Sequence, residues 1–75
     1  MFSFQANLKT IEDVKHFVQA SARMGCDIEI KVGPYIVDGK SIMGIFSLDR
    51  TAPVTILVHG DEIARDKLKC AVDGF

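Results

Sequence analysis

The chain has 75 residues, of which 48% are hydrophobic and 25% are charged, and its formal net charge at pH 7 is −1. A chain of this length forms one small domain, residues 1–75, and the composition is typical of a globular core with a soluble surface. The near-neutral charge, without a block of basic residues, argues against nucleic acid or an anionic membrane as the main partner. No apolar run approaches the roughly 20 residues of a membrane span, and the N-terminus lacks a signal-peptide pattern. We therefore expect no membrane insertion and a cytoplasmic location.

The two cysteines, Cys26 and Cys70, are too few and too far apart for a disulfide framework or a zinc site. Both have apolar neighbours, which predicts reduced and at least partly buried thiols. No metal and no cofactor is expected from the sequence.

The first half of the chain predicts a strand, a helix and a second strand. Residues 1–6 alternate aromatic and polar side chains, the period of a half-buried strand. Thr10 then stands at a helix N-cap position, with Asp13 at the third helical position as in a capping box, and Gly25 is expected to end the helix. Residues 27–32 alternate again and form the clearest strand. The expected apolar face of the helix consists of Ile11, Val14, Phe17, Val18, Ser21 and Met24.

The second half predicts two further strands and two helices. Gly33 and Pro34 form a turn into a short strand over residues 35–37, and Ser41 has the side chain preferred at the N-cap of a short, unusually apolar helix. Residues 54–59 form the last strand. The last helix opens at residues 60–61, and its expected apolar positions are Ala64, Leu68, Ala71, Val72 and Phe75. This order predicts an α+β domain in which a four-stranded antiparallel sheet is covered by three helices on one face.

The run Lys40-Ser41-Ile42-Met43-Gly44, followed by Ser47-Leu48, resembles the region around the regulatory serine of the HPr family. HPr is the histidine-containing phosphocarrier of the bacterial sugar phosphotransferase system. The run Phe17-Val18-Gln19-Ala20 also matches that family's first helix, and the element order is that of HPr. The resemblance covers nearly the whole chain and implies an HPr-like open-faced β-sandwich.

The histidine motif of the family has no counterpart in this chain. HPr carries phosphate on a histidine at the N-terminus of its first helix, within a Gly-Leu-His-Ala-Arg-Pro-like motif. Counting back from residues 17–20, Thr10 takes the place of the histidine, and Glu12 and Asp13 take those of the arginine and proline. A one-residue gap would place Lys9 there instead. Because a carboxylate about 4 Å from a phosphate charge costs on the order of 4 kcal/mol, Thr10, Glu12 and Asp13 predict a degenerate phosphocarrier site.

Ser41 has two interpretations, and so do its apolar neighbours. The serine is either a plain helix cap or, as the resemblance implies, a residue phosphorylated by HPr kinase, with Lys40 adjacent. Ile42, Met43 and Phe46 either cover the edge of the sheet or, together with Lys40, form a surface that docks partner proteins.

The resemblance implies a regulatory or binding module of the phosphotransferase system that docks through the Ser41 helix and is not an enzyme. Such a module is similar to catabolite-repression HPr homologues, and its expected partners are phosphotransferase proteins, HPr kinase or a transcription regulator. Two alternatives stay open: a phosphocarrier that uses His16, and an HPr-fold protein unrelated to sugar uptake. His16 is predicted on the polar face of the first helix, at least one turn from its N-terminus. The sequence leaves the oligomeric state open.

Overall fold

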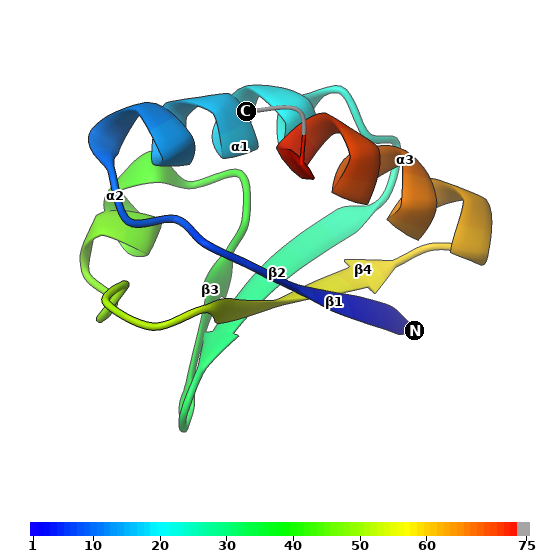
Figure 1. The fold of residues 1–75 in the computed structure, drawn as a ribbon. Coiled ribbons are helices and arrows are strands. Elements are labelled where there is room, and N and C mark those ends of the chain that lie inside the picture. The colour runs from blue at the N-terminus through cyan, green and yellow to red at the C-terminus, as the bar shows by residue number, and fades with distance from the viewer. Residues whose placement is uncertain (74–75) are drawn as a thin grey trace.

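The computed structural model describes residues 1–73 and contains four strands and three helices (Figure 1). In chain order these elements are β1 (Phe2–Ala6), α1 (Ile11–Ala22), β2 (Asp27–Val32), β3 (Tyr35–Asp38), α2 (Ile42–Phe46), β4 (Val54–His59) and α3 (Glu62–Asp73).

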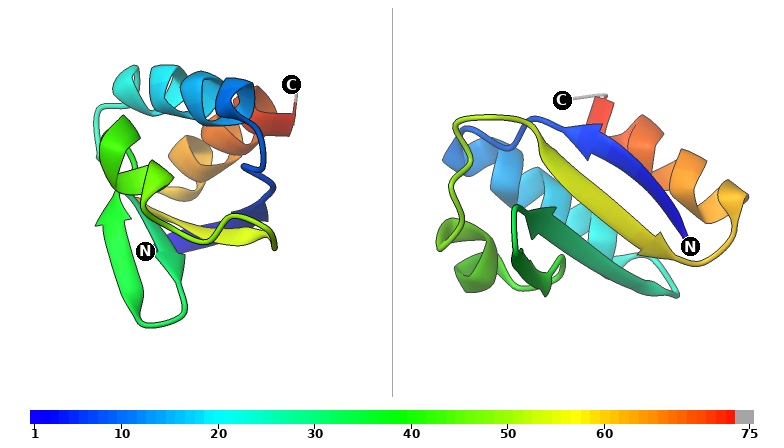
Figure 2. Two further views of the ribbon diagram at one scale, coloured as in Figure 1. Left: turned by 90° about the vertical axis from the view of Figure 1, so that its left-hand side faces the viewer. Right: turned by 90° about the horizontal axis from the view of Figure 1, so that it is seen from below.

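The four strands form one antiparallel sheet in the order β1-β4-β2-β3. The helices lie together on one face of this sheet and leave the other face uncovered (Figures 1 and 2). The predicted fold class is therefore confirmed. The two central strands, β2 and β4, place Ile30 opposite Ile56 in the middle of the sheet.

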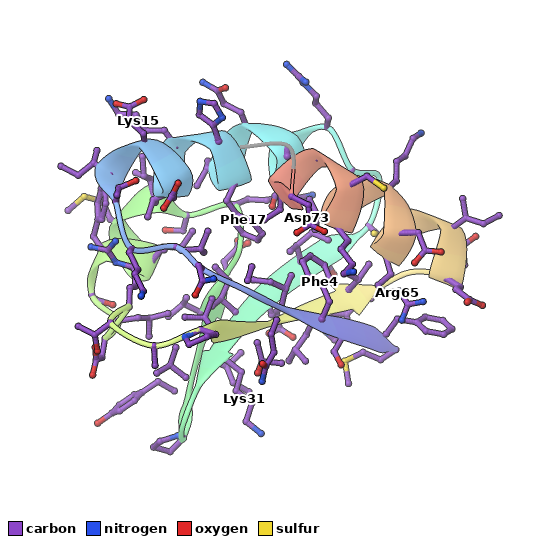
Figure 3. All side chains as sticks on the ribbon, in the orientation of Figure 1. Phe4, Lys15, Phe17, Lys31, Arg65 and Asp73 are labelled. Carbon is purple, nitrogen blue, oxygen red and sulfur yellow. The ribbon has the colours of Figure 1, made fainter. Side chains whose placement is uncertain are left out.

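The core lies between the sheet and the helices, and the strand periodicity predicted it well. Phe17 points from α1 toward the sheet, whereas Lys15 points away from it and Lys31 extends from the uncovered face (Figure 3). Alternation along a strand sends successive side chains to opposite faces, so the covered face of each strand carries the apolar residues. The buried apolar side chains are Phe4, Ala6, Leu8, Val14, Phe17, Ile28, Ile30, Ile45, Val54, Ile56, Val58, Leu68 and Val72.

Several positions assigned to the core by helical spacing lie outside it. Ile11 is 60% exposed because it is the first residue of α1, and Ala71 is exposed on α3. Both cysteines are free, but Cys70 is exposed, so the prediction that both thiols are partly buried holds only for Cys26. The prediction for Phe75 falls outside the described residues.

Gly25 does not end α1 in the predicted way. The helix ends at Ala22, where the N–H group of the C-cap residue Arg23 donates to the Ala20 carbonyl at 3.2 Å and the next N–H group, that of Met24, donates to the Ser21 carbonyl at 3.0 Å. Within residues 1–73 a positive φ occurs only at Gly33, so Gly25 is not in the left-handed conformation of a glycine C-cap. The last turn tightens with short-range hydrogen bonds instead.

Candidate functional site

The N-terminus of α1, where the HPr family carries its phosphoryl group, is closed by a capping box. The Asp13 N–H group donates to Thr10 Oγ1 at 3.0 Å, and the Thr10 N–H group donates to Asp13 Oδ2 at 3.3 Å. This reciprocal pair confirms the predicted cap. The carboxylate of Asp13 therefore occupies the end of the helix that would otherwise attract an anion.

The side chains around this helix end offer no phosphate acceptor of the histidine type. Glu12 is exposed in the first turn beside the half-buried Asp13, and the first turn holds no basic residue. His16 is exposed at the sixth position of α1, more than one turn from the cap. His59 ends β4, where its Nε2 contacts Glu29 Oε1 on the uncovered face of the sheet.

Arg50 is a structural residue of this region that the sequence did not indicate. Its Nη1 donates to the carbonyls of Leu8 at 2.8 Å and Lys9 at 3.2 Å, in the connection that leads into α1. Its guanidinium also lies over the ring of Phe46, 5.2 Å from the centroid. Arg50 thereby ties α2 to the segment before α1. No local pattern could predict this contact, because the partners are about 40 residues apart in the chain.

Ser41 caps α2 as predicted. Its Oγ accepts a hydrogen bond from the Gly44 N–H group at 3.2 Å, and its own N–H group donates to the Asp38 carbonyl at 3.1 Å. The segment that leads from β3 to this cap lies close to β2, since the Gly39 N–H group donates to the Ile28 carbonyl at only 2.7 Å. The end of β3 and the start of α2 are therefore held in one orientation against β2.

Lys40 forms hydrogen bonds with both its backbone N–H group and its side-chain ammonium. Its N–H group donates to Asp38 Oδ1 at 2.9 Å, and its Nζ donates to the Met24 carbonyl at 3.4 Å. The ammonium is thus directed toward the connection between α1 and β2. It still adds positive charge beside the N-cap of α2.

The structure separates the three apolar residues of the predicted docking surface by exposure. Met43 is 76% exposed, whereas Ile42 and Phe46 are half-buried and pack against the core. Ile45, on the inner side of α2, is completely buried. A partner at α2 would therefore contact Met43 first, with only parts of Ile42 and Phe46 around it. That a partner docks here stays a prediction.

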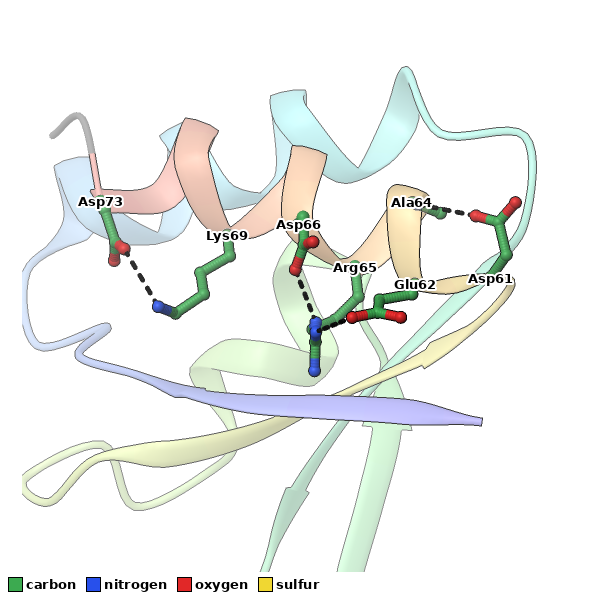
Figure 4. A network of polar contacts seen from close by, with 7 residues as sticks. All are labelled: Asp61, Glu62, Ala64, Arg65, Asp66, Lys69 and Asp73. Carbon is green, nitrogen blue, oxygen red and sulfur yellow. Dashed lines mark hydrogen bonds and ion pairs between the residues drawn. The ribbon is translucent and has the colours of Figure 1, made fainter.

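The side of α3 next to β1 carries a row of polar contacts (Figure 4), and the guanidinium of Arg65 also lies over the ring of Phe2, 5.5 Å from its centroid. Arg65 contacts Glu62 at 3.4 Å and Asp66 at 2.9 Å, and Lys69 lies 3.8 Å from Asp73 one turn later (Figure 4). Exposed ion pairs of this kind contribute about 0–1 kcal/mol each. They stabilise α3 slightly and form no reactive centre.

Residues 1–73 contain neither a metal-binding cluster nor a membrane-spanning helix. No group of three or more His, Cys, Asp or Glu side chains in this part of the chain could hold a metal ion. None of the described helices is both long enough and apolar enough to cross a bilayer.

Comparison with known proteins places this architecture among small phosphocarrier proteins. No protein-family model matches the chain, and no curated protein matches it. Among solved structures, HPr-C-His from Thermoanaerobacter tengcongensis has a TM-score of 0.79 and 24% identity over 99% of this chain and 93% of that one. The phosphocarrier protein HPr from Bacillus anthracis has a TM-score of 0.72 and 25% identity, covering 96% and 93% of the two chains.

The catabolite repression protein Crh of Bacillus subtilis is also similar, with a TM-score of 0.70 and 28% identity over 95% of this chain and 85% of that one. Its crystal structure is described as an intertwined dimer with a swapped domain. These three likenesses confirm that this chain has the HPr fold over nearly its whole length. They also confirm the resemblance to the HPr family that the sequence indicated.

Proposed function

We propose that this protein is a binding and regulatory module of the bacterial phosphotransferase system that does not carry phosphate on a histidine. The observation that carries the proposal is the closed, anionic N-terminus of α1. Thr10 and Asp13 cap each other there, and Glu12 adds a second carboxylate to the same turn. The likeness to HPr and Crh supports an HPr-like role in general.

The electrostatic balance at α1 opposes a phosphoryl group. A helix N-terminus favours an anion by about 0.3–1 kcal/mol at an exposed position. A carboxylate about 4 Å from the phosphate charge opposes it by on the order of 4 kcal/mol at an effective dielectric of about 20. Even after a large reduction for solvent screening, Glu12 and Asp13 outweigh the helix dipole. Arg50 Nη1 donates to the Leu8 and Lys9 carbonyls, so this donor is already used within the chain and does not point freely at an incoming phosphate.

The surface around α2 supports the docking part of the proposal. Met43 offers a large, adaptable apolar side chain to solvent, and such side chains are enriched where proteins bind one another. A phosphate on Ser41 would add about −1.5 to −2 charge next to this side chain. The modification would change the sign of the surface that a partner meets. A transcription regulator that binds the phosphorylated form, the partner implied by the resemblance to catabolite-repression HPr homologues, would respond to that change.

The proposal is tested with HPr kinase and ATP, using Ser47 as an internal control. Both serines flank α2, and Ser47 Oγ donates to the Gly44 carbonyl at 2.6 Å. Intact-mass measurement should show one phosphate on the wild type and on Ser47→Ala, and none on Ser41→Ala. A phosphorylated protein should then change its affinity for a phosphotransferase partner or regulator, whereas Ser41→Ala should not respond to the kinase. No phosphate on the folded wild type, together with no affinity for any phosphotransferase protein, would favour an HPr-fold protein with another role.

A further inference from the structure

The outer edge of β3 is an unpaired strand edge with exposed apolar side chains. β3 is the last strand in the sheet order, and the β2–β3 hairpin extends away from the helices and from the other strands (Figures 1 and 2). Tyr35 is 68% exposed and Ile36 is 52% exposed. An open edge of this kind is a template on which another strand can pair.

The backbone groups at this edge can be assigned from the sheet register. The Gly39 N–H group donates to the Ile28 carbonyl, and this pair lies one step beyond Asp38 in the β2–β3 register. Hydrogen-bonded and non-hydrogen-bonded pairs alternate along an antiparallel ladder, so Ile36 and Asp38 form non-hydrogen-bonded pairs with β2. Their N–H and C=O groups therefore point toward the open edge. The Asp38 carbonyl is already engaged by the Ser41 N–H group at 3.1 Å.

The turn that closes the hairpin agrees with this assignment. Two residues, Gly33 and Pro34, connect the paired residues Val32 and Tyr35, and Gly33 has φ +57°. A glycine with positive φ at the first central position, followed by a residue with negative φ, is the pattern of a type II′ turn. Such a turn is flanked by a hydrogen-bonded pair. That places Ile36, the next residue, with its N–H and C=O groups facing outward.

We propose that a second copy of this chain pairs with the β3 edge, antiparallel and centred on Ile36. With the two-fold axis at this residue, the Ile36 N–H group of each copy donates to the Ile36 carbonyl of the other. Two positions away, Asp38 of one copy faces Pro34 of the second copy. Pro34 has no N–H group to donate, and the carbonyl that it would have bonded is the Asp38 carbonyl that Ser41 already engages. Pro34, which lacks a donor, therefore lies opposite the Asp38 carbonyl, which is already occupied. The other hydrogen bond of this pair runs from the Asp38 N–H group to the Pro34 carbonyl of the second copy.

The side chains fit the same register. Residues directly opposite in an antiparallel pair share a face, so Tyr35 of one copy lies opposite Val37 of the second copy. Beside Val37 is a groove of about 620 Å³, also lined by Ser47 and Leu48, over which this tyrosine would pack. No like charges stand directly opposite each other, since Asp38 faces a proline. An unrelated extended peptide would present an N–H group where Pro34 has none, so the pattern favours a second copy over another strand.

The test is the concentration dependence of the molar mass, measured by analytical ultracentrifugation from about 10 μM to about 1 mM protein. The wild type should show a monomer–dimer equilibrium. Ile36→Lys places two ammonium groups at the axis, and Ile36→Pro removes only the outward donor, which edge positions tolerate. Each should raise the dimer dissociation constant at least about tenfold. The matched control is Ile63→Lys on α3, because Ile63 is 75% exposed and distant from this edge in the fold, and it should leave the constant unchanged.

Cross-linking tests the register directly. Opposite residues of a hydrogen-bonded pair have Cα atoms about 5.5 Å apart, within the range that a disulfide spans. In a Cys70→Ser background, Ile36→Cys should form a covalent dimer under mild oxidation, whereas Ile63→Cys should not. A wild type that stays monomeric at the highest concentration would overturn the proposal. So would a dimer that Ile36→Lys does not weaken, as expected if β1 were exchanged between copies or if another face were used.

Discussion

Replacing Gly39 with alanine should destabilise the domain through one close contact with the core. A Cβ atom at residue 39 would lie 2.7 Å from Ile28 Cγ2 and 3.0 Å from the Ile28 carbonyl oxygen. Ile28 is only 1% exposed, and its carbonyl also accepts the Gly39 N–H group, so neither group can move without disturbing β2. Overpacking of this kind costs about 1–3 kcal/mol. For a domain of this size the melting temperature should fall by roughly 4–8 °C for each kcal/mol.

Gly25 provides the matched control for this substitution. A Cβ atom there would meet nothing within 4 Å, and the residue does not have a positive φ. Gly25→Ala should therefore keep the wild-type melting temperature or raise the free energy of unfolding by about 0.4–1 kcal/mol. Both variants are measured by thermal and urea denaturation. Equal destabilisation of the two, or no loss in Gly39→Ala, would refute the inference that residue 39 packs too closely against Ile28 to accept a Cβ atom.

Three other predictions concern α2 and the loop that follows it. Met43→Asp should leave the free energy of unfolding within about 0.5 kcal/mol of the wild type, because the side chain is 76% exposed at the second position of a helix, while any partner affinity at α2 falls. Ile45→Ala, in contrast, should cost about 2–5 kcal/mol in urea denaturation, because that side chain is fully buried, and equal effects of the two would show that Met43 belongs to the core. Hydrogen bonds from the Thr51 side chain and then from its backbone hold the pKa of Asp49 below its ordinary value of 3.8, so Thr51→Ala should raise that pKa in an NMR titration. Because the folded-state pKa is lowered, the stability that this contact contributes is present above about pH 4 and is lost as the pH falls through the lowered value. An unchanged Asp49 pKa in Thr51→Ala would contradict this assignment.

Strand periodicity and helix caps made most of the fold predictable. Alternation placed Ile28, Ile30 and Ile56 on the covered face of the sheet, and all three are buried. Thr10 and Ser41 were predictable as N-caps because a cap depends on residues within three positions in the chain. Signals of this kind depend on residues that are close together in the sequence, so they can be recognised without knowledge of the tertiary contacts.

The errors and omissions came from tertiary contacts. Helical spacing assigned Ile11 to the core, but spacing does not say where a helix extends past the sheet, and Ile11 is 60% exposed. The link from Arg50 to the Leu8 and Lys9 carbonyls, and the contact between Glu29 and His59, join residues 30 or more positions apart. Each of these depends on which elements become neighbours, which periodicity alone does not specify.

For the candidate site, too, the local features could be predicted from the sequence, and the features that depend on tertiary contacts could not. The absence of a histidine at the N-terminus of the first helix, and the presence of Glu12 and Asp13 there, could be seen in the sequence. The exposure of the α2 residues could not, because a five-residue helix that is apolar nearly all round has no clear inner face. The structure supplies that face by burying Ile45 and exposing Met43. The hydrogen bond from Lys40 Nζ to the Met24 carbonyl likewise follows from the packing of α1 beside the Ser41 turn.

Phosphate transfer from phosphoenolpyruvate, through the enzyme that charges HPr, shows whether this protein carries phosphate on a histidine. The wild type, His16→Ala and a histidine-bearing HPr are incubated side by side, and acid-labile phosphate is located by mass spectrometry at neutral pH. We expect full labelling of the HPr control and no phosphohistidine on this protein, because the N-terminus of α1 holds carboxylates and a closed capping box instead of an imidazole. Stoichiometric acid-labile phosphate on the wild type that disappears in His16→Ala would contradict it.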